Sequence, residues 1–333
     1  MAVRTFARPR LLLSRCIEFD RCRWNGDMIA SPVVRMLAPE ADMVPVCPET
    51  EIGLGVPRDP VRLVRAGGDD RLVQPATGRD ITAAMGAFAI RFLDAAGSLD
   101  GIILKNRSPS CGTGNVRIYA GTASPVVAAK GPGIFARAVL DRYPGLPLED
   151  EGRLRNFRIL DHFLTAVFTI ADFRELKEAG GGIRRLIRFH AENKLLLSAH
   201  NRSLARAMGR IAGGGEQEGM IPAYEALLLQ ALARPPRPGA VIDVLLHAAG
   251  HFSGRVTAAE KALLLDALGR YRRGQADACA AKSIVRAWIV RFEDGYLDRQ
   301  TFFAPYPDTL FARDAEIPGH GRDLWAERPQ ANP

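Results

Sequence analysis

The sequence contains no apolar stretch of the roughly 18 residues that a transmembrane helix needs, so a membrane-spanning protein is not expected. The apolar run Leu11–Leu13 follows basic residues but is too short for the core of a secretion signal. Acidic residues are outnumbered by basic ones, which gives a formal net charge of +8. We therefore expect a cytoplasmic protein with no membrane contact, whose positive charge is compatible with an anionic partner.

Cysteine is scarce, and its number is odd. The five cysteines are Cys16, Cys22, Cys47, Cys111 and Cys279. An odd number in a cytoplasmic chain argues against a disulfide framework. Four of them lie in the first third of the chain, where a shared site can form.

The length and composition favour two ordinary globular domains. A chain of 333 residues has room for about two domains of roughly 150 residues each. Its 47% of hydrophobic and 25% of charged residues are typical of globular proteins. The glycine triplet Gly180–Gly182 follows a helical pattern and marks a boundary. We predict one domain over residues 1–180 and a second over residues 181–333.

Short apolar runs followed by turn residues predict three strands in the first half. They are "RLLLSRC", "DMVPVCPE" and "LDGIILKNRSPSC". Helical patterns lie between them, a short one in "SPVVRMLA" and a longer one in "GRDITAAMGAFAIRFLDAAG". Strands that alternate with helices predict an α/β fold with a parallel, Rossmann-like sheet.

A cysteine follows each of the three predicted strands. In parallel α/β sheets, sites form beyond the carboxyl ends of the strands, where Cys16, Cys47 and Cys111 lie. A single cysteine is usually a small buried hydrophobic residue, but three in equivalent positions indicate a shared site. Cys22 is either a bystander or a fourth ligand. Cys279 lies in an Ala-rich helical segment, where packing is its expected role.

The distribution of histidine bears on which metal group such a site would hold. All six histidines lie at or beyond His162, so none is near the three cysteines. Zinc usually takes a fourth ligand, often histidine, whereas thiolates without imidazole favour an iron–sulfur cluster. Three ligands leave one iron of a cubane cluster without a protein ligand, and that iron can act as a Lewis acid toward a substrate atom such as sulfur.

Three longer motifs resemble those of the thiouracil desulfidase (TudS) family. They are "SRCIEFDRCRWNGD", "PVCPETEIGLGVPRDP" and "LKNRSPSCGTGNVRIYAG". The resemblance implies a 4Fe–4S cluster held by Cys16, Cys47 and Cys111, with one iron that lacks a protein ligand. It further implies that this iron binds the sulfur of a thiocarbonyl base, which water then replaces. Cys22 matches no ligand of the family.

The same resemblance implies an acidic residue and a serine beside the cluster. By motif position, Glu49 is the first choice with Glu51 next, and Ser108 is the first choice with Ser110 next. Lys105 ends the third predicted strand and is expected to face the site. For Arg58 two roles remain open, a contact to an RNA phosphate or a pair with a carboxylate.

The second half resembles the all-helical domain that is often fused behind this desulfidase domain. The motifs are "LIRFHAENKLLLSAHNRSLARAMGR", "HAAGHFSGRVTAAEKALLLDALGRYRRG" and "YLDRQTFFAPYPDTL". The fused form is similar to tRNA 4-thiouridine desulfidases, and this similarity implies that the helical domain helps to hold tRNA.

The residue pattern of this half is compatible with tRNA binding, but it is also compatible with a helical domain that binds no RNA. A helix predicted from about Ile183 to Ile211 carries exposed cations on shared faces because several are spaced by four. The predicted RNA-contacting cations are Arg184, Arg188, Lys194, Arg202, Arg206 and Arg210. They are either phosphate contacts or a solvated helix face. The aromatics of "FFAPYPD" either stack on bases or cap the helical core. His247 and His251 have a metal-binding spacing, but without a third ligand we expect them to pack.

The predicted function is therefore removal of sulfur from a thiolated uracil, most naturally 4-thiouridine in tRNA, which gives uridine and hydrogen sulfide. Two alternatives remain open. One is a desulfidase of free thiouracil or thionucleosides. The other is a cluster- or zinc-holding protein that binds nucleic acid and is not an enzyme. The sequence contains no indication of the oligomeric state.

Overall fold

The leucine run that precedes Cys16 forms an inner strand of a four-stranded parallel sheet, as predicted. In the computed structural model, which describes residues 4–311, this sheet has the order β2-β1-β6-β9. Its strands are β1 (Arg10–Ser14), β2 (Asp42–Val46), β6 (Gly101–Leu104) and β9 (Leu148–Asp150), and every pair is parallel. Leu11, Leu12 and Leu13 are fully buried because β1 is covered on both faces. Pro45 is tolerated because β2 is an edge strand.

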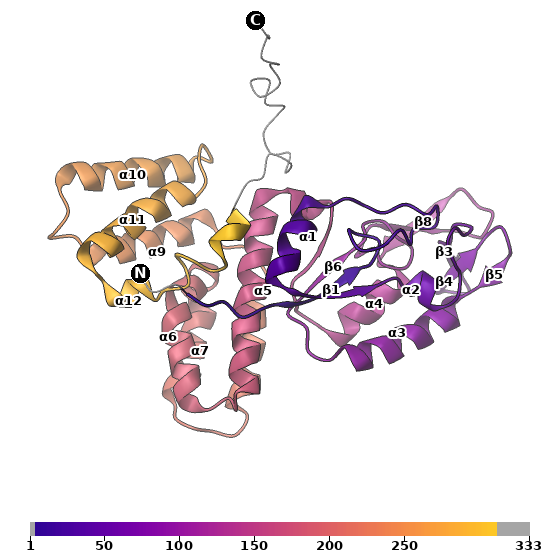
Figure 1. Ribbon diagram of the computed structural model, residues 1–333, viewed down its shortest axis with the longest axis horizontal. Coiled ribbons are helices and arrows are strands. Elements are labelled where there is room, and N and C mark those ends of the chain that lie inside the picture. The colour runs from indigo at the N-terminus through magenta and orange to yellow at the C-terminus, as the bar shows by residue number, and fades with distance from the viewer. Residues whose placement is uncertain (1–3, 312–333) are drawn as a thin grey trace, which may run out of the picture. The chain divides into compact units, whose positions relative to one another are not determined.

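Both predicted helices of the first half are present. Helix α1 (Pro32–Leu37) is capped by Ser31, whose hydroxyl accepts a hydrogen bond from the Val34 amide. Helix α3 (Thr82–Ala96) ends at Gly97, whose φ of 68° suits glycine. Two further helices, α2 (Pro48–Glu51) and α4 (Ile134–Arg142), complete this part (Figure 1). The core between sheet and helices includes Leu12, Ile102, Met85, Phe88, Phe135 and Val139.

A second sheet, which was not predicted, lies in the same part of the chain. Its order is β5-β4-β3-β7-β8, with β3 and β7 parallel and the other pairs antiparallel. The strands are β3 (Arg62–Ala66), β4 (Asp69–Gln74), β5 (Arg79–Asp80), β7 (Val116–Tyr119) and β8 (Val127–Gly131). Three short 3-10 turns are also present, at Ala38–Glu40, Arg153–Arg155 and Asp308–Phe311.

The two compact units of the structure divide inside a helix. The α/β unit comprises Arg8–Phe163 with the segment that begins at Asp308, and the helical unit comprises Leu164–Pro307 with the segment that ends at Ala7. The division thus falls within α5 (Phe157–Glu178), whereas the glycine triplet had predicted it at residue 180. Residues 312–333 of the predicted second domain lie outside the described residues.

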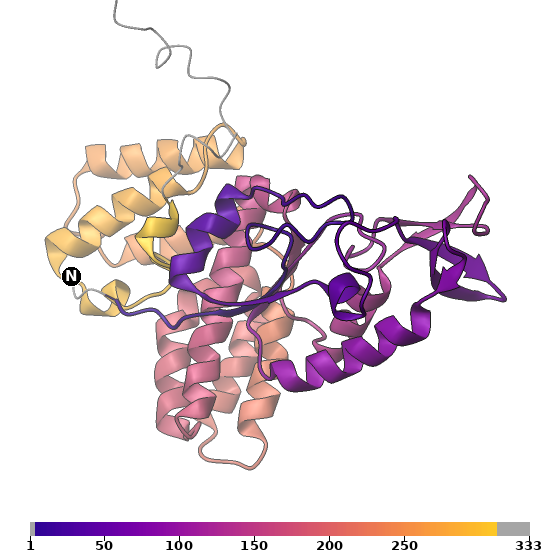
Figure 2. The same cartoon turned by 45° about the vertical axis from the view of Figure 1, so that its right-hand side comes forward.

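The helical unit confirms the predicted all-α second half, with one difference. The single helix expected from Ile183 to Ile211 is two helices, α6 (Ile183–His200) and α7 (Arg202–Gly213). Asn201 separates them, because its side chain accepts hydrogen bonds from the Ser203 and Leu204 amides and so caps α7. The remaining helices are α8 (Met220–Leu232), α9 (Pro238–Gly250), α10 (Ala258–Arg272), α11 (Cys279–Phe292) and α12 (Gly295–Asp298) (Figure 2).

Aromatic side chains fill the core of the helical unit, and the "FFAPYPD" segment belongs to that core. Phe302, Phe303 and Tyr306 are at most 6% exposed, and the Tyr306 ring lies 6.4 Å from that of Phe168. Of the two roles left open for these aromatics, the structure therefore shows core packing. No helix among residues 4–311 is long and apolar enough to cross a membrane.

His247 lies in α9 and His251 directly follows this helix, and both are exposed, so the structure does not confirm the expected packing role for His247. The rings of His247 and His251 lie 5.9 Å apart. His251 stacks on Tyr296, and its Nδ1 lies 3.3 Å from an Asp294 carboxylate oxygen.

Candidate active site

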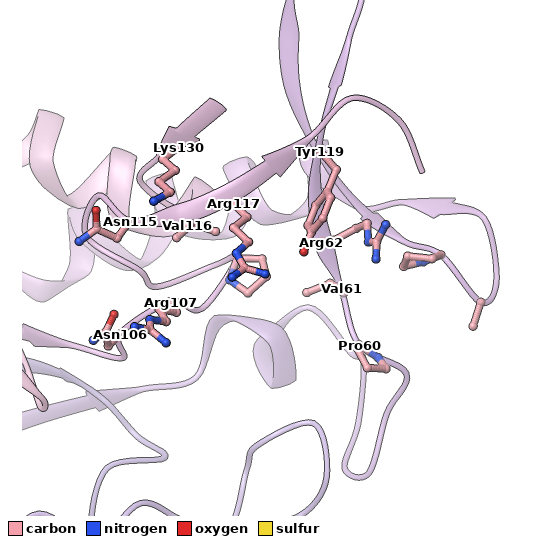
Figure 3. A pocket seen from close by; sticks show the side chains of 13 residues that line it. Pro60, Val61, Arg62, Asn106, Arg107, Asn115, Val116, Arg117, Tyr119 and Lys130 are labelled. Atoms are coloured by element: carbon pink, nitrogen blue, oxygen red, sulfur yellow. The ribbon is translucent and has the colours of Figure 1, made fainter. Parts of the chain in front are cut away.

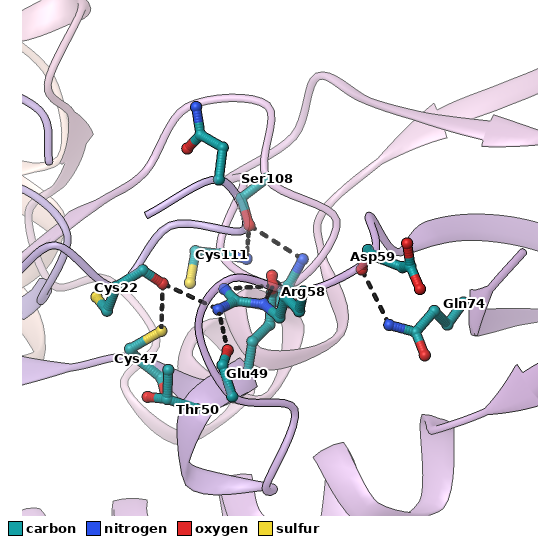
Figure 4. Close-up of polar contacts among 12 residues, drawn as sticks. Cys22, Cys47, Glu49, Thr50, Arg58, Asp59, Gln74, Ser108 and Cys111 are labelled. Carbon is teal, nitrogen blue, oxygen red and sulfur yellow. Dashed lines mark hydrogen bonds and ion pairs between the residues drawn. The ribbon is translucent and has the colours of Figure 1, made fainter. Parts of the chain in front are cut away.

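Four cysteines line one cavity of about 350 Å³ in the α/β unit. Cys16 follows β1, Cys47 follows β2, and Cys111 lies in the loop after β6. Because these strands are parallel and adjacent in one sheet, their carboxyl ends bring the three thiols to one edge of the sheet, as predicted. Figure 4 shows Cys47 and Cys111 on this side of the cavity. Cys22 lines the same cavity, and all four thiols are at most 9% exposed.

Burial and neighbouring groups raise the pKa values of the Cys47 and Cys111 thiols. A hydrogen bond to Cys22, together with burial, raises the pKa of the Cys47 thiol. Burial also raises the pKa of Cys111, although the Ser14 and Ser108 hydroxyls beside its sulfur act in the opposite direction. A metal group bound here must therefore displace thiol protons, and the Ser14 hydroxyl can then donate a hydrogen bond to the Cys111 thiolate.

The donor set of the cavity is of the kind that iron–sulfur clusters use. No three His, Cys, Asp or Glu side chains within residues 4–311 are arranged to hold one metal ion. The cavity is lined by four thiols and no imidazole, and it is large enough for a bulkier group. Thiolates without imidazole are the ligands that iron–sulfur clusters use. Cys16, Cys47 and Cys111 would hold such a group, and Cys22 lies beside them.

A fixed carboxylate stands at the wall of this cavity. Glu49 Oε1 accepts a hydrogen bond of 2.8 Å from the Ser110 hydroxyl, and its Oε2 pairs with the Arg58 guanidinium at 2.8 Å. The Arg58 side chain is only 4% exposed and also donates to the Cys22 carbonyl oxygen at 3.0 Å. Of the two roles left open for Arg58, the structure thus shows the carboxylate pair, which orients Glu49. Glu51 pairs with Arg15 at 3.1 Å and does not line the cavity.

The two serines of the third motif have different positions. Ser108 lines the cavity, and its Oγ accepts hydrogen bonds from the Ser110 and Cys111 amides. Its hydroxyl proton can therefore point into the cavity. Ser110 is fully buried behind Glu49 and does not line the cavity. Lys105 lines it, as expected, and its Nζ pairs with Glu151 at 2.6 Å.

Two glycines let the Ser108–Cys111 loop pack closely against its neighbours. A Cβ on Gly133 would lie 2.4 Å from the Ser110 carbonyl oxygen, and one on Gly112 would lie 2.8 Å from that of Ser108. A side-chain carbon at either position would clash with these carbonyl oxygens unless the backbone of the loop moved. Glycine at these positions therefore holds Ser108 and Cys111 in place.

We predict that Gly133→Ala destabilises the protein and disturbs the cavity. Forcing an extra carbon into close-packed structure costs about 1–3 kcal/mol, so the midpoint of thermal unfolding should fall by several degrees. Gly86→Ala is the matched control, because Gly86 lies within α3 and, apart from its chain neighbours and the helix backbone around it, no described atom lies within 4 Å of the added Cβ. That change should raise the midpoint slightly. Equal midpoints for the two variants would show that the close approach at Gly133 is unimportant.

Trp24 is a residue of the cavity that the sequence reasoning missed. Its side chain is 46% exposed although it is large and apolar, and it lines the cavity next to Arg23. The Arg58 amide donates to its carbonyl oxygen at 2.8 Å, which ties this loop to the second motif. An exposed indole at such a rim suits stacking on a base. The available signal was a large aromatic directly before the turn residues Asn25 and Gly26.

Comparison with known proteins assigns the α/β unit. The family model described as 2-thiouracil desulfurase matches residues 11–151. The uncharacterized protein YbbK of Bacillus subtilis (strain 168) is 36% identical over 121 residues, which is 34% of this chain and 79% of that protein. Through this segment, the chain belongs to the 2-thiouracil desulfurase family. The cysteine cavity of this 2-thiouracil desulfurase unit lies within the matched residues.

The other comparisons concern the helical half and one solved structure. A family model described as a protein of unknown function (DUF1722) matches residues 194–307. The uncharacterized protein YbgA of Escherichia coli (strain K12) is 24% identical over 164 residues, which is 48% of this chain and 97% of that protein. A structure titled as the [4Fe-4S]-dependent thiouracil desulfidase TudS shares 30% identity, with a TM-score of 0.35. The match covers 44% of this chain and 93% of that chain.

The predicted RNA-contacting cations of the helical unit lie on two helices. Arg184, Arg188 and Lys194 belong to α6, and Arg202, Arg206 and Arg210 belong to α7. All six are exposed, and within the described part of the chain none forms an ion pair with a carboxylate. Lys194, Arg202 and Arg206 line one cavity of about 980 Å³, together with His190, His247 and Asp243. The other three cations lie outside it.

Proposed function

We propose that the protein is an iron–sulfur-dependent desulfidase that hydrolyses the thiocarbonyl of a thiolated uracil, with 4-thiouridine in tRNA as its substrate. The observation that carries this proposal is the single cavity that joins three cysteines from three strand ends to the fixed Glu49 carboxylate and the Ser108 hydroxyl. It is supported by membership of the 2-thiouracil desulfurase family over the residues that form this cavity. The products are the corresponding uracil carbonyl and hydrogen sulfide.

The proposed reaction breaks the C–S bond of a C=S group and forms a C=O group from water. A cluster held by Cys16, Cys47 and Cys111 would supply an iron that acts as a Lewis acid toward the sulfur. Glu49, held by Ser110 and Arg58, takes a proton from the attacking water. The Ser108 hydroxyl donates a hydrogen bond to the base and helps to move a proton to its ring nitrogen. Both protons of water finally leave with the sulfur as hydrogen sulfide, so the substrate is neither oxidised nor reduced.

The side chains around Glu49 and Ser108 are proposed to position the substrate base in the cavity. Trp24 at the rim offers a stacking surface for a pyrimidine. Lys105 adds a positive charge that its pair with Glu151 holds in place. A base inside an RNA must leave its stack to reach such a cavity, and this costs a few kcal/mol. A helical domain that grips the RNA would offset part of that cost.

A comparison of substrates tests this proposal. Protein reconstituted with iron and sulfide without oxygen is given 4-thiouracil, 4-thiouridine or tRNA that contains 4-thiouridine, and sulfide release is measured. The proposal predicts turnover of all three, with the highest kcat/KM for the tRNA. Higher kcat/KM for the free base would favour a desulfidase of free thiolated bases, and iron-loaded protein without any turnover would favour the non-enzymatic alternative.

The helical unit leads to a separate prediction about RNA affinity. Arg202→Ala combined with Arg206→Ala should weaken tRNA binding, because both guanidinium groups are exposed at one cavity and neither forms an ion pair within residues 4–311. Each lost phosphate contact should reduce the slope of log affinity against log salt by about 0.7–0.9. Filter binding of tRNA at several salt concentrations measures both quantities. Release of sulfide from free 4-thiouracil should be unchanged, because neither residue belongs to the α/β unit.

A charge-matched double variant controls for the change in net charge. Arg234→Ala with Arg272→Ala removes two exposed cations of the same unit that do not line the cavity. This control should keep nearly the full affinity. Equal losses for the two double variants would show that the cations of α6 and α7 are a solvated face rather than an RNA contact.

A further inference from the structure

All four cysteines of the α/β unit line the cysteine cavity, although the proposed cluster uses only three of them. A larger cavity, of about 920 Å³, shares Asn106 and Pro109 with it but has no cysteine among its described lining residues (Figure 3). A 4Fe–4S cluster is commonly held by four cysteine thiolates, one on each iron. The cysteine cavity therefore provides one thiol for each iron, and Cys22 is the thiol without an assigned iron.

Cys22 has the surroundings of a ligand. It is 2% exposed, and its thiol is in hydrogen-bond contact with the thiols of Cys16 and Cys47, two of the three proposed ligands. A cysteine that only fills space packs as a small hydrophobic residue. The Cys22 thiol instead contacts two other thiols and the Arg15 guanidinium. Its position thus places a fourth sulfur against the proposed cluster.

A single buried side chain fixes the backbone around Cys22. Arg58 donates a hydrogen bond to the Cys22 carbonyl oxygen at 3.0 Å, and its amide donates to the Trp24 carbonyl oxygen at 2.8 Å (Figure 4). Arg58 is itself held by its ion pair with Glu49. The Cys22 sulfur can therefore move between rotamers without movement of the loop.

A positive group lies beside the Cys22 sulfur. The Arg15 guanidinium contacts this thiol, and it is held by Glu51 at 3.1 Å and by the Thr50 hydroxyl at 2.6 Å. Hydrogen bonds from a guanidinium to an anion are among the strongest in proteins. A Cys22 thiolate that leaves an iron can thus be received by Arg15 without taking up a proton.

We propose that Cys22 is the ligand of the fourth iron in the resting protein and leaves this iron when the sulfur of the substrate binds. The inference rests on the function proposed above and deepens it, because it describes how the reactive position is protected between turnovers. One iron–thiolate bond breaks and one bond from iron to the thiocarbonyl sulfur forms, so no electron is transferred. The Cys22 thiolate turns to Arg15 and returns after hydrogen sulfide has left.

Retention of iron by Cys22→Ala measures this role without any turnover. Reconstituted full-length proteins are exposed to ferricyanide, and conversion to a three-iron cluster is followed by electron paramagnetic resonance and iron analysis. The fourth iron should leave Cys22→Ala at least about tenfold faster than the wild type, since loss of a residue that supports a metal site weakens metal binding about 10–100-fold. Cys279→Ala removes a thiol of the helical unit and should behave as the wild type.

Two outcomes of this experiment would overturn the proposal. Equal rates of iron loss from Cys22→Ala and the wild type would show that Cys22 only packs in the cavity. A folded Cys22→Ala protein that takes up no cluster would show that Cys22 is needed at all times and is not exchanged.

Binding of sulfide tests the exchange itself. Sodium sulfide is titrated without oxygen into the reconstituted proteins, and the visible absorption of the cluster reports binding. Cys22→Ala should bind sulfide about tenfold more tightly, the change expected when a binding-competent state of about 10% becomes the only state. Arg15→Gln should bind sulfide more weakly than the wild type, because the displaced thiolate loses its partner.

The double variant separates this role of Arg15 from a structural one. In the Cys22→Ala background no thiolate is displaced, so Arg15→Gln should leave sulfide affinity unchanged. An equal loss of affinity in both backgrounds would overturn the exchange with Arg15.

The iron and sulfide readouts also separate failure of this role from failure of the proposed function. Faster iron loss and tighter sulfide binding in Cys22→Ala, with a wild type that desulfurises no base, would retain the ligand and overturn the function. A wild type that desulfurises 4-thiouracil but loses its fourth iron as fast as Cys22→Ala would retain the function and overturn the ligand.

Discussion

Changing Cys16, Cys47 or Cys111 singly to alanine is expected to abolish both iron binding and desulfurisation. Each of the three thiols follows a different strand of one sheet and lines the same cavity, so each variant removes one of the three proposed ligands. Iron and sulfide content after anaerobic reconstitution, together with the visible absorption of the cluster, measures binding. Activity on 4-thiouracil should fall to the background of protein without iron.

The other two cysteines provide matched controls for these variants. Cys279→Ala changes a half-buried residue at the start of α11 in the helical unit and should keep iron and activity. Cys22→Ala should also keep them, although Cys22 lies in the cavity and touches Cys47. A folded Cys279→Ala protein without iron would contradict the ligand assignment. Loss of the cluster in Cys22→Ala would make Cys22 a fourth ligand.

Glu49→Gln is expected to keep the cluster but to lose about 10²–10⁴-fold in kcat, the usual contribution of a general acid or base. Glutamine retains the shape of the side chain and can still accept the hydrogen bond from Ser110, but it cannot take a proton from water. Iron content shows that the site is intact, and single-turnover rates with 4-thiouracil measure the loss. Ser108→Ala should lower kcat by a factor in the same range, again without loss of iron.

Glu51→Gln is the internal control for this prediction. Glu51 lies two residues away in the same short helix but pairs with Arg15 outside the cavity. Its variant should turn over nearly as fast as the wild type. Normal turnover by Glu49→Gln with an inactive Glu51→Gln would reverse the choice between the two carboxylates.

The strands and the meeting of the three cysteines could be predicted because both follow from local pattern. Short apolar runs ended by turn residues define parallel strands, and parallel strands present their carboxyl ends at one edge. Three thiols at equivalent positions must then lie near each other, whatever the details of the loops. No histidine lies near these cysteines in the sequence. The prediction of an iron–sulfur cluster instead of zinc was based on this choice of ligands.

The choice of Glu49 over Glu51 and of Ser108 over Ser110 rested on motif position, because the local residue pattern does not distinguish the members of either pair. Glu49 and Glu51 occupy one turn of helix, where residues two apart point in different directions. The residue that faces the cavity is determined by the ion pair between Glu49 and Arg58. Arg58 lies nine residues further along the chain, so this contact is not visible in the local helical pattern. The same holds for Ser108 and Ser110, because burial of Ser110 behind Glu49 is a tertiary contact.

The second sheet and the break between α6 and α7 were missed for opposite reasons. Strands such as β8 (Val127–Gly131) are largely exposed, so they lack the apolar runs that identify buried strands. Asn201, in contrast, is a residue type strongly preferred at helix N-caps, so it indicates the start of a new helix within the long helical pattern. Recognising it would have divided the arginines between two helices from the start.

The most direct test of the account is whether bound iron is required for equimolar release of sulfide and uracil from 4-thiouracil. Wild-type protein is assayed without oxygen after reconstitution, after removal of iron by a chelator, and after a second reconstitution. We predict equal amounts of uracil and sulfide from the loaded protein, none after chelation, and recovery when the cluster is restored. Sulfide release that persists at the same rate after removal of iron would contradict the central claim.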